Sequence, residues 1–411
     1  MPAKTKKPWE SAMPAKQFDF MRTILDAPSP IGHEGSMTYG VLKPYLEKLK
    51  LKSWKIHQFK GNAGIVLDTD PGDDSKCSFM IIGHADKIRM QVRSIGEDGK
   101  IWINTDSFLP TTLIGHEVKL FSEDPKSPGK YRIIQGGTIE AIGAIHFADA
   151  SLRAGNKGIK GEMMYLELQI HGDDPQGQVK RLGIRPGDSM ILDRPIKRGF
   201  SKHSFYGAYL DNGLGCFVVA ELAKLVAKAG GLDNIRLQFA MATHEEIGRF
   251  GSTAMVGELR PDVILGVDVN HDYGAAPGIG HRRMTPLTMG QGFSLTTGSV
   301  TSEFLNAQIQ IAAKAAGIPV QKDVAGRDTG TDAMAAALAG VDAASTSIGF
   351  PIRNMHTISE TGHTGDVLAA IYGLEATFKK LNRMNRGKGV KADDFRNNHT
   401  RLDKAKSLTS K

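Results

Sequence analysis

Two adjacent carboxylates, Glu245 and Glu246, are the first candidates for chemistry in this sequence. They follow residues 235–242 (IRLQFAMA), a mostly apolar run that ends in a polar turn with glycine and therefore predicts a buried strand. Because adjacent residues on an extended strand end point in opposite directions, the two glutamates cannot do the same job. One is suited to bind a cation while the other acts as a general base. Taken in isolation, a Glu-Glu pair is more simply a solvated acidic turn.

Other side chains of the metal-binding type stand at the ends of predicted strands or at the start of a predicted helix. They are His84, Asp211, Asp268 and His356, in addition to the two glutamates. In open α/β sheets, ligands gather beyond the carboxyl ends of the strands, so these side chains are expected to converge. Two histidines, two aspartates and one glutamate form an oxygen and nitrogen donor set suited to zinc, cobalt or manganese.

Each residue alone has a simpler interpretation. Asp211 could be a helix N-cap, and His84 a hydrogen-bonded interior histidine. Asp268 could close a turn with Asn270, and His356 could be a surface loop residue. Taken together, the five residues are better explained by a dinuclear metal site.

The elements that must position these residues follow an α/β pattern with one interruption. Predicted helices and buried strands alternate over residues 17–88 and 203–382, which we assign to a discontinuous catalytic domain. Over residues 89–202, short strand-like runs alternate with turns, which predicts a small inserted β domain, barrel-like or sandwich-like. Residues 1–16 and 383–411 are predicted to be basic, disordered tails.

Composition limits the class and compartment of the protein. The 411 residues are 40% hydrophobic, which is sufficient for a globular protein of two domains. No apolar run approaches the ~20 residues that span a membrane, and the N-terminus lacks the apolar segment of a secretory signal. The only cysteines, Cys77 and Cys216, cannot form a disulfide framework. We therefore expect a cytoplasmic protein with no membrane contact.

The net charge of +8 does not by itself indicate a nucleic-acid partner. Residues 379–411 contain eleven Lys and Arg against three Asp, which accounts for the whole imbalance. A tail rich in Gly, Asn, Ser and Lys is more simply a solvated end than a binding surface, so nucleic-acid binding is not expected.

Five segments, in this order, resemble the tetrahedral or glutamyl aminopeptidase family of dinuclear metallopeptidases: GHADKIRM, LDNGLGC, THEEIGRFGS, GVDVNH and PIRNMHTISE. The resemblance covers roughly residues 17–380. It implies a mixed central sheet flanked by helices, as in zinc peptidases, with an inserted small β-barrel-like domain. It also implies an aminopeptidase that acts on peptides, with two divalent ions per subunit; zinc is favoured, and cobalt or manganese are alternatives. The family forms dimers that assemble into tetrahedral dodecamers, through contacts expected in the β insert.

The resemblance also implies a role for each candidate residue. His84 and Asp268 would hold one metal ion, Glu246 and His356 the other, and Asp211 would bridge the two; Glu245 would be the general base, and Asp86 would orient the imidazole of His84.

The sequence departs from the family pattern at a few positions. Lys87 stands where an acid is usual, Arg89 where a small residue is common, and Gly213 where arginine is usual. Asp332 matches the pattern and could be structural or contact substrate. One hypothesis is that Lys87 and Arg89 make the mouth of the site positive and favour acidic substrate residues. The alternative is that both face solvent or the domain junction.

Two other functions stay open from the sequence. Dinuclear deacylases share the order of ligands, but they place their extra domain after the fourth ligand. Here about 124 residues separate Asp86 from Asp211, whereas 21 separate Glu246 from Asp268, which favours the aminopeptidase. A glycosidase is discounted because adjacent glutamates that point apart cannot flank a sugar cleft. A non-catalytic metal-binding scaffold with a basic tail would not need Glu245.

Overall fold

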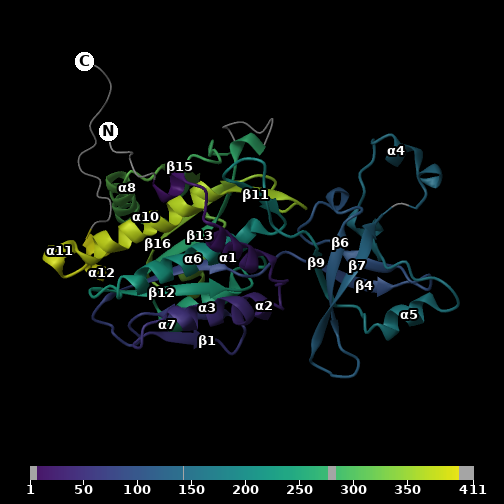
Figure 1. Ribbon diagram of the computed structural model, residues 1–411, viewed down its shortest axis with the longest axis horizontal. Helices are drawn as coiled ribbons and strands as arrows, with labels where there is room; N and C mark the ends of the chain where they lie inside the picture. Colours follow the sequence, from purple (N-terminus) through teal and green to yellow (C-terminus); the bar gives the residue numbers. More distant parts are fainter. Residues whose placement is uncertain (1–6, 142, 276–283, 398–411) are drawn as a thin grey trace, which may run out of the picture.

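The computed structural model describes residues 7–141, 143–275 and 284–397. The rest of the predicted tails (1–6 and 398–411) and part of a glycine-rich loop (276–283) lie outside these residues. A large body of sheet and helices holds the predicted catalytic residues, and a small β-barrel projects from one end of it (Figure 1).

The body is built on a mixed eight-stranded sheet with the strand order β1-β2-β12-β3-β13-β16-β14-β15. Its strands are β1 (Lys55–Gln58), β2 (Gly64–Asp68), β3 (Cys77–His84), β12 (Ile235–Ala242), β13 (Val263–His271), β14 (Phe293–Gly298), β15 (Val320–Ala325) and β16 (Ala344–Ile352). The four central strands β12, β3, β13 and β16 are parallel, whereas β2 pairs antiparallel with β12 and β14 antiparallel with β16. The predicted mixed sheet is confirmed.

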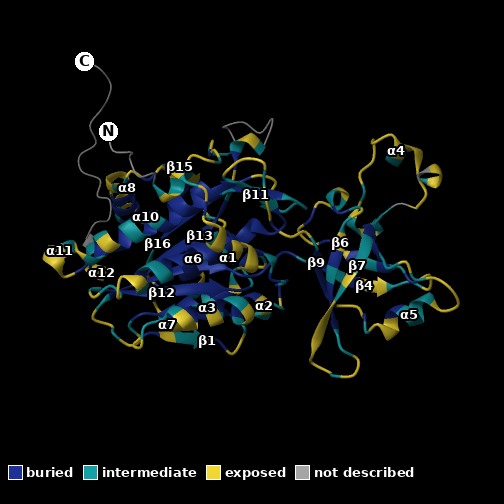
Figure 2. Ribbon diagram, viewed as in Figure 1, coloured by how far each residue is buried: buried dark blue, intermediate teal, exposed yellow. Residues whose placement is uncertain are grey.

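Helices cover both faces of this sheet. One face carries α1 (Ala15–Asp26), α3 (Lys43–Leu49), α6 (Leu210–Lys228), α8 (Glu303–Ala316) and α10 (Thr364–Asn382); the other carries α7 (Phe250–Leu259) and α9 (Ala335–Ala339). Successive residues of β3 belong to different cores, since Phe79 and Ile81 pack with the first group and Met80 and Ile82 with the second. Strands β3 and β12 are therefore buried along their whole length (Figure 2).

The inserted β domain is a closed six-stranded barrel in the order β4-β5-β8-β7-β6-β9. Its strands are β4 (Met90–Ile95), β5 (Ile101–Asn104), β6 (Glu117–Glu123), β7 (Tyr131–Glu140), β8 (Tyr165–Glu167) and β9 (Ser189–Leu192), with the short helices α4 (Ala150–Arg153) and α5 (Pro175–Arg181) in its connections. The barrel has a hydrophobic core of its own, which Tyr209 of the returning chain completes. Closure removes exposed strand edges.

Smaller elements complete the body. They are α2 (Gly35–Met37), a π turn at Thr38–Leu42, and a three-stranded sheet of β10 (Lys197–Arg198), β11 (Ser204–Gly207) and β17 (Glu360–His363). The π turn leads directly into α3, which has Pro44 in its first turn, where proline is tolerated in a helix. Among the residues described, no helix is long and apolar enough to cross a bilayer.

Parts of both expected tails are folded, which corrects the sequence-based prediction. In the N-terminal one, a 3-10 turn stands at Pro8–Glu10, Met13 is buried and α1 begins at Ala15.

The same correction applies to residues 383–397. This segment forms α11 (Met384–Gly387) and α12 (Ala392–Asn397). Val390 and Phe395 are buried, and the Phe395 ring packs edge-on against Phe79 and Phe304. Two apolar residues in a basic segment are sufficient to dock it, although the composition of the segment is polar.

A buried ion pair joins β2 to β12. Asp68 has no exposed surface, and Arg236 donates to both of its carboxylate oxygens, at 3.0 and 2.7 Å. Burial alone would raise the pKa of Asp68, but contacts with His57 and Arg236 lower it to about 2. We expect Asp68→Asn to lower the free energy of unfolding at pH 7 by about 3–5 kcal/mol, because Arg236 would stay buried without its partner.

The pH dependence of this pair has a definite sign. Since the pKa in the folded state lies below the ~3.9 of an unfolded chain, the stabilisation is complete above about pH 4 and is lost as the pH falls through 2. Urea unfolding at about pH 7, 4 and 2.5 should therefore show the unfolding free energies of the wild type and Asp68→Asn converging at low pH. Asp74→Asn, at a carboxylate that also faces Arg236 but is exposed, is the control and should change stability by less than about 1 kcal/mol. Equal stability of Asp68→Asn and wild type at pH 7 would contradict the prediction.

Candidate metal centre

Two glycines allow the start of α6 to lie against the sheet. A Cβ atom on Gly83 would lie 2.5 Å from the carbonyl carbon of Gly215, and a Cβ on Gly215 would lie 2.3 Å from the carbonyl oxygen of Val267. Any side chain at either position would push the helix away. This close approach brings Asp211, in the first turn of α6, to His84 at the end of β3.

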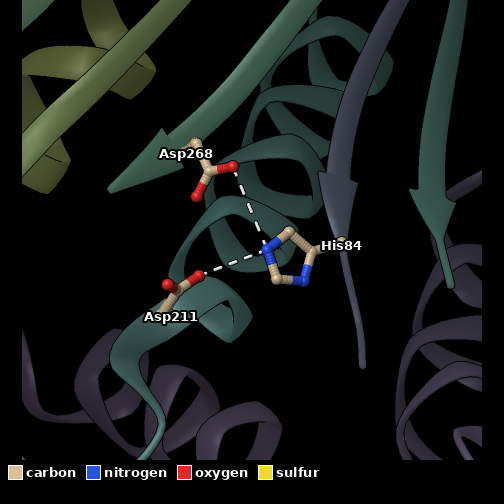
Figure 3. A group of neighbouring side chains, drawn as sticks. All are labelled: His84, Asp211 and Asp268. Carbon is tan, nitrogen blue, oxygen red and sulfur yellow. Dashed lines mark ion pairs between the residues drawn. The ribbon is translucent and has the colours of Figure 1, made fainter. Parts of the chain in front are cut away.

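The first group of candidate ligands is His84, Asp211 and Asp268 (Figure 3). Nε2 of His84 lies 3.2 Å from Oδ1 of Asp211 and 3.9 Å from Oδ2 of Asp268. Asp268 is on β13, the parallel neighbour of β3, so the two strands deliver their side chains to the same edge. All three residues are buried, and their ligand atoms lie within 4.8 Å of one another.

The second group is Asp211, Glu246 and His356. Nε2 of His356 lies 3.0 Å from Oδ2 of Asp211 and 3.6 Å from Oε1 of Glu246. Asp211 therefore presents one carboxylate oxygen to His84 and the other to His356. The structure brings all five predicted ligands together, with Asp211 between the two groups.

The adjacent glutamates lie in the turn after β12, which ends at Ala242, and they face different histidines. Glu246 faces His356, whereas Oε2 of Glu245 lies 3.9 Å from Nε2 of His84. Oε1 of Glu245 accepts a hydrogen bond from Nε of Arg249 at 3.2 Å. Glu245 belongs to neither group of candidate ligands.

Asp86 does more than the sequence suggested. Its Oδ1 lies 3.4 Å from Nδ1 of His84, and its main-chain oxygen lies 3.2 Å from the same nitrogen, which is the expected contact with the imidazole. Its two carboxylate oxygens also accept the backbone N–H groups of Glu245 and Glu246, each at 3.1 Å. One buried carboxylate thus connects the strand that carries His84 to the turn that carries both glutamates.

Glu360 is a residue of the site that the sequence did not single out. Its buried carboxylate accepts the backbone N–H groups of Leu210 at 2.6 Å, Asp211 at 3.3 Å and His356 at 2.8 Å. It therefore fixes two of the three segments that form the second group, those of Asp211 and His356. Burial raises the pKa of Glu360 to about 8. The segment PIRNMHTISE contains this residue, but nothing in the local sequence separates it from an exposed glutamate.

Asn212, not Asp211, caps the regular part of α6. Asp211 and Asn212 have non-helical backbone angles, and the peptide bond between them is cis. Oδ1 of Asn212 accepts the N–H of Gly215 at 2.8 Å, and its amide donates to the carbonyl of Val267 at 2.7 Å. The Asp211 carboxylate is therefore available to other partners.

The site concentrates buried negative charge. Burial, followed by neighbouring carboxylates, raises the pKa of Glu245 to about 8 and that of Asp268 well above its usual range. Contacts with Asp211 and Glu246 raise the pKa of His356 to about 11. Oδ1 of Asp211 and Oε1 of Glu246 are buried, and neither accepts a hydrogen bond from the described part of the chain. Unpaired buried oxygens among carboxylates and imidazoles fit divalent cations of the zinc type.

The structure does not support the hypothesis that Lys87 makes the mouth of the site positive. Lys87 is 2% exposed, and its Nζ donates to the carbonyl oxygens of Leu25 and Ala27, both at 2.6 Å. Arg89 donates to the carbonyl of Ile31 and to the hydroxyl of Ser189 in the barrel. Both side chains are used at the junction between body and barrel, which was the alternative interpretation.

The other two positions noted in the sequence are also accounted for by packing. A Cβ on Gly213 would lie 2.7 Å from Cδ2 of Leu25, so the glycine makes room for the residue whose carbonyl Lys87 binds. Asp332 is buried and accepts a hydrogen bond from the hydroxyl of Ser252 on α7. Burial raises the pKa of Asp332 to about 6.

Comparisons with known proteins identify relatives of this chain. The sequence profile of the M42 glutamyl aminopeptidase family matches residues 64–372. The lysyl aminopeptidase of Pyrococcus furiosus is 24% identical over 376 residues, which cover 90% of this chain and 98% of that protein. The TET aminopeptidase of the Thaumarchaeota archaeon SCGC AB-539-E09 has a similar fold, with a TM-score of 0.78 and 21% identity over 93% of this chain and all of that chain. The TET1 peptidase of Pyrococcus horikoshii, which can assemble into a tetrahedron or a large octahedral shell, gives a TM-score of 0.70 at 17% identity over 88% of this chain and 98% of that chain.

Proposed function

Because the chain belongs to the M42 glutamyl aminopeptidase family and is a peptide hydrolase, we propose that it removes N-terminal residues from peptides with the help of two divalent metal ions. Zinc is the favoured metal, with cobalt or manganese as alternatives. The proposed ligands are His84, Asp211 and Asp268 for one ion and Asp211, Glu246 and His356 for the other.

The observation that carries this proposal is the position of Asp211 between two groups of ligands. Its two oxygens face His84 and His356 separately, which is the arrangement that a bridging carboxylate requires. When bound, divalent ions would polarise the peptide carbonyl and lower the pKa of water.

In this proposal, Glu245 is the general base. Its carboxylate faces the cluster without belonging to either ligand group, so it is free to take the proton of the attacking water. The oxygen of that water adds to the carbonyl carbon, the C–N bond breaks, and Glu245 returns the proton to the leaving amine. Asp86 fixes the backbone of Glu245 for this task.

We also propose that copies of the chain associate through the barrel. The barrel lobe exposes several large apolar side chains, namely Leu109, Tyr131, Ile133, Phe147 and Leu182. Such residues are typical of contact surfaces, and the related TET1 peptidase forms large shells. The proposed compartment remains the cytoplasm, since Cys77 and Cys216 are both buried as free thiols.

Hydrolysis of free and N-blocked dipeptides tests the proposed function. Protein loaded with zinc, cobalt or manganese should cleave dipeptides with a free amine at least about 100-fold faster than their N-acetyl forms, because an exopeptidase site must bind that amine. Glu-, Leu- and Lys-dipeptides in the same assay would define the preferred residue. Preferential cleavage of the N-acetyl group would instead establish the deacylase, and no turnover of either series with any of the metals would favour the scaffold.

A further inference from the structure

Arg249 lies behind the proposed general base. It stands at the N-terminus of α7 with its side chain 18% exposed. Its Nε donates to Oε1 of Glu245 at 3.2 Å, and its Nη1 donates to Oδ2 of Asp328 at 3.0 Å. Within the described ranges, Arg249 is the one lysine or arginine that forms an ion pair with any of the site carboxylates, which are Asp86, Asp211, Glu245, Glu246 and Asp268.

The backbone of the glutamate turn is already fixed without this arginine. Asp86 accepts the N–H groups of both glutamates, and the carbonyl of Glu245 accepts the N–H groups of Gly248 and Arg249, each at 3.0 Å. These bonds leave the side chain of Glu245 free to rotate about three bonds. Restricting that rotation costs about 1.5–2 kcal/mol of conformational entropy. The contact with Arg249 restricts it.

The contact also has a direction. Arg249 holds Oε1 of Glu245, while the other oxygen, Oε2, lies 3.9 Å from Nε2 of His84. One oxygen is thus turned away from the cluster and the other towards it. A planar guanidinium can pair with two carboxylates at once, which an ammonium group does with much less geometric control. Asp328, in the loop after β15, is the second carboxylate that Arg249 pairs with, and this contact holds the arginine in place.

We propose that Arg249 is a positioning residue, which holds Oε1 of Glu245 so that Oε2 faces the reacting water, and that Asp328 holds Arg249 in place. The inference rests on the proposed function, in which Glu245 is the general base. It assigns to Arg249 an effect on the rate of the chemical step and not on substrate or metal binding.

Steady-state kinetics of the metal-loaded enzyme test this assignment. Arg249→Met should lower kcat about 10- to 100-fold, which is the usual range for misplacing a catalytic group, with KM changed less than about 3-fold. Asp328→Asn should lower kcat less, and the double variant should be no slower than Arg249→Met alone, because both changes remove one linked contact. Added guanidinium should partly restore kcat in Arg249→Ala. Arg260→Met, at an exposed arginine that ends the same helix with a similar left-handed backbone, is the matched control and should keep wild-type kcat.

Other measurements separate positioning from a structural role. The metal content of Arg249→Met should equal that of the wild type. In metal-free protein, the melting temperature of the Glu245→Gln, Arg249→Met double variant should fall no further than the larger of the two single effects. Wild-type kcat in Arg249→Met, a loss that appears in KM alone, or a loss of metal would each overturn the inference. Glu245→Gln, assayed in parallel, distinguishes failure of this inference from failure of the proposed function. If Glu245→Gln is inactive while Arg249→Met is fully active, the proposed function stands and this inference fails. If Glu245→Gln is fully active, the proposed function itself fails.

Discussion

Replacing Glu245 with glutamine is expected to remove nearly all peptide hydrolysis while leaving the metal content unchanged. Glutamine keeps the shape of the side chain but cannot accept the proton of the attacking water, and general bases contribute about 10²- to 10⁴-fold to rate. Glu245 lies outside both ligand groups, so its substitution should not release an ion. Measurement of kcat on a free dipeptide, together with elemental analysis of the same sample, gives both quantities.

Two other glutamates, Glu246 and Glu258, provide the controls for this experiment. Glu246→Gln alters a proposed ligand, so it should lose metal as well as activity. Glu258 is an exposed residue of α7, so Glu258→Gln should change neither the metal content nor the activity. Turnover by Glu245→Gln within about tenfold of the wild type would show that another group takes the proton.

Asp211→Asn is expected to weaken the binding of both metal ions at once. The two oxygens of Asp211 face the two ligand groups separately, and an amide offers one oxygen without the negative charge. Each ion should bind at least about 100-fold more weakly, beyond the 10- to 100-fold typical of losing an outer partner of a metal ligand. Titration of metal-free protein against a chelator of known affinity measures both constants.

Substitutions of a ligand that belongs to only one of the two groups complete this comparison. Asp268→Asn should weaken mainly the ion of the first group, and Glu246→Gln mainly that of the second. An Asp211→Asn protein that binds one ion with wild-type affinity would show that Asp211 is not shared.

The sequence was sufficient to predict the positions of side chains that depend on strand direction. His84 and Asp268 could be expected together because parallel neighbouring strands end at one edge of the sheet. Glu245 and Glu246 were expected to diverge as adjacent strand residues do; they do face different histidines, but from the turn after β12 ends at Ala242. The barrel was predictable because short strands and turns follow one another without helical periodicity.

Other features depend on contacts that leave no local pattern. Glu360 and Asn212 act on backbone groups of segments far away in the sequence, so no spacing in the sequence reveals them. Lys87 follows Asp86 directly, yet its side chain turns to the carbonyl groups at the end of α1. Val390 and Phe395 dock a polar segment, which average composition cannot show.

The two chain crossings between body and barrel have a mechanical consequence. The outgoing crossing leaves directly after His84, whereas the returning chain passes through β10 and β11 of the body before it reaches Tyr209, two residues before Asp211. The Tyr209 ring packs in the barrel core, and its hydroxyl accepts the N–H of Leu192. A tilt of the barrel would therefore act on Asp211 through Tyr209, while His84 on β3 and Asp268 on β13 stay with the sheet. Association of copies of the chain through the barrel, as proposed above, would in this way also affect the spacing of the ligands.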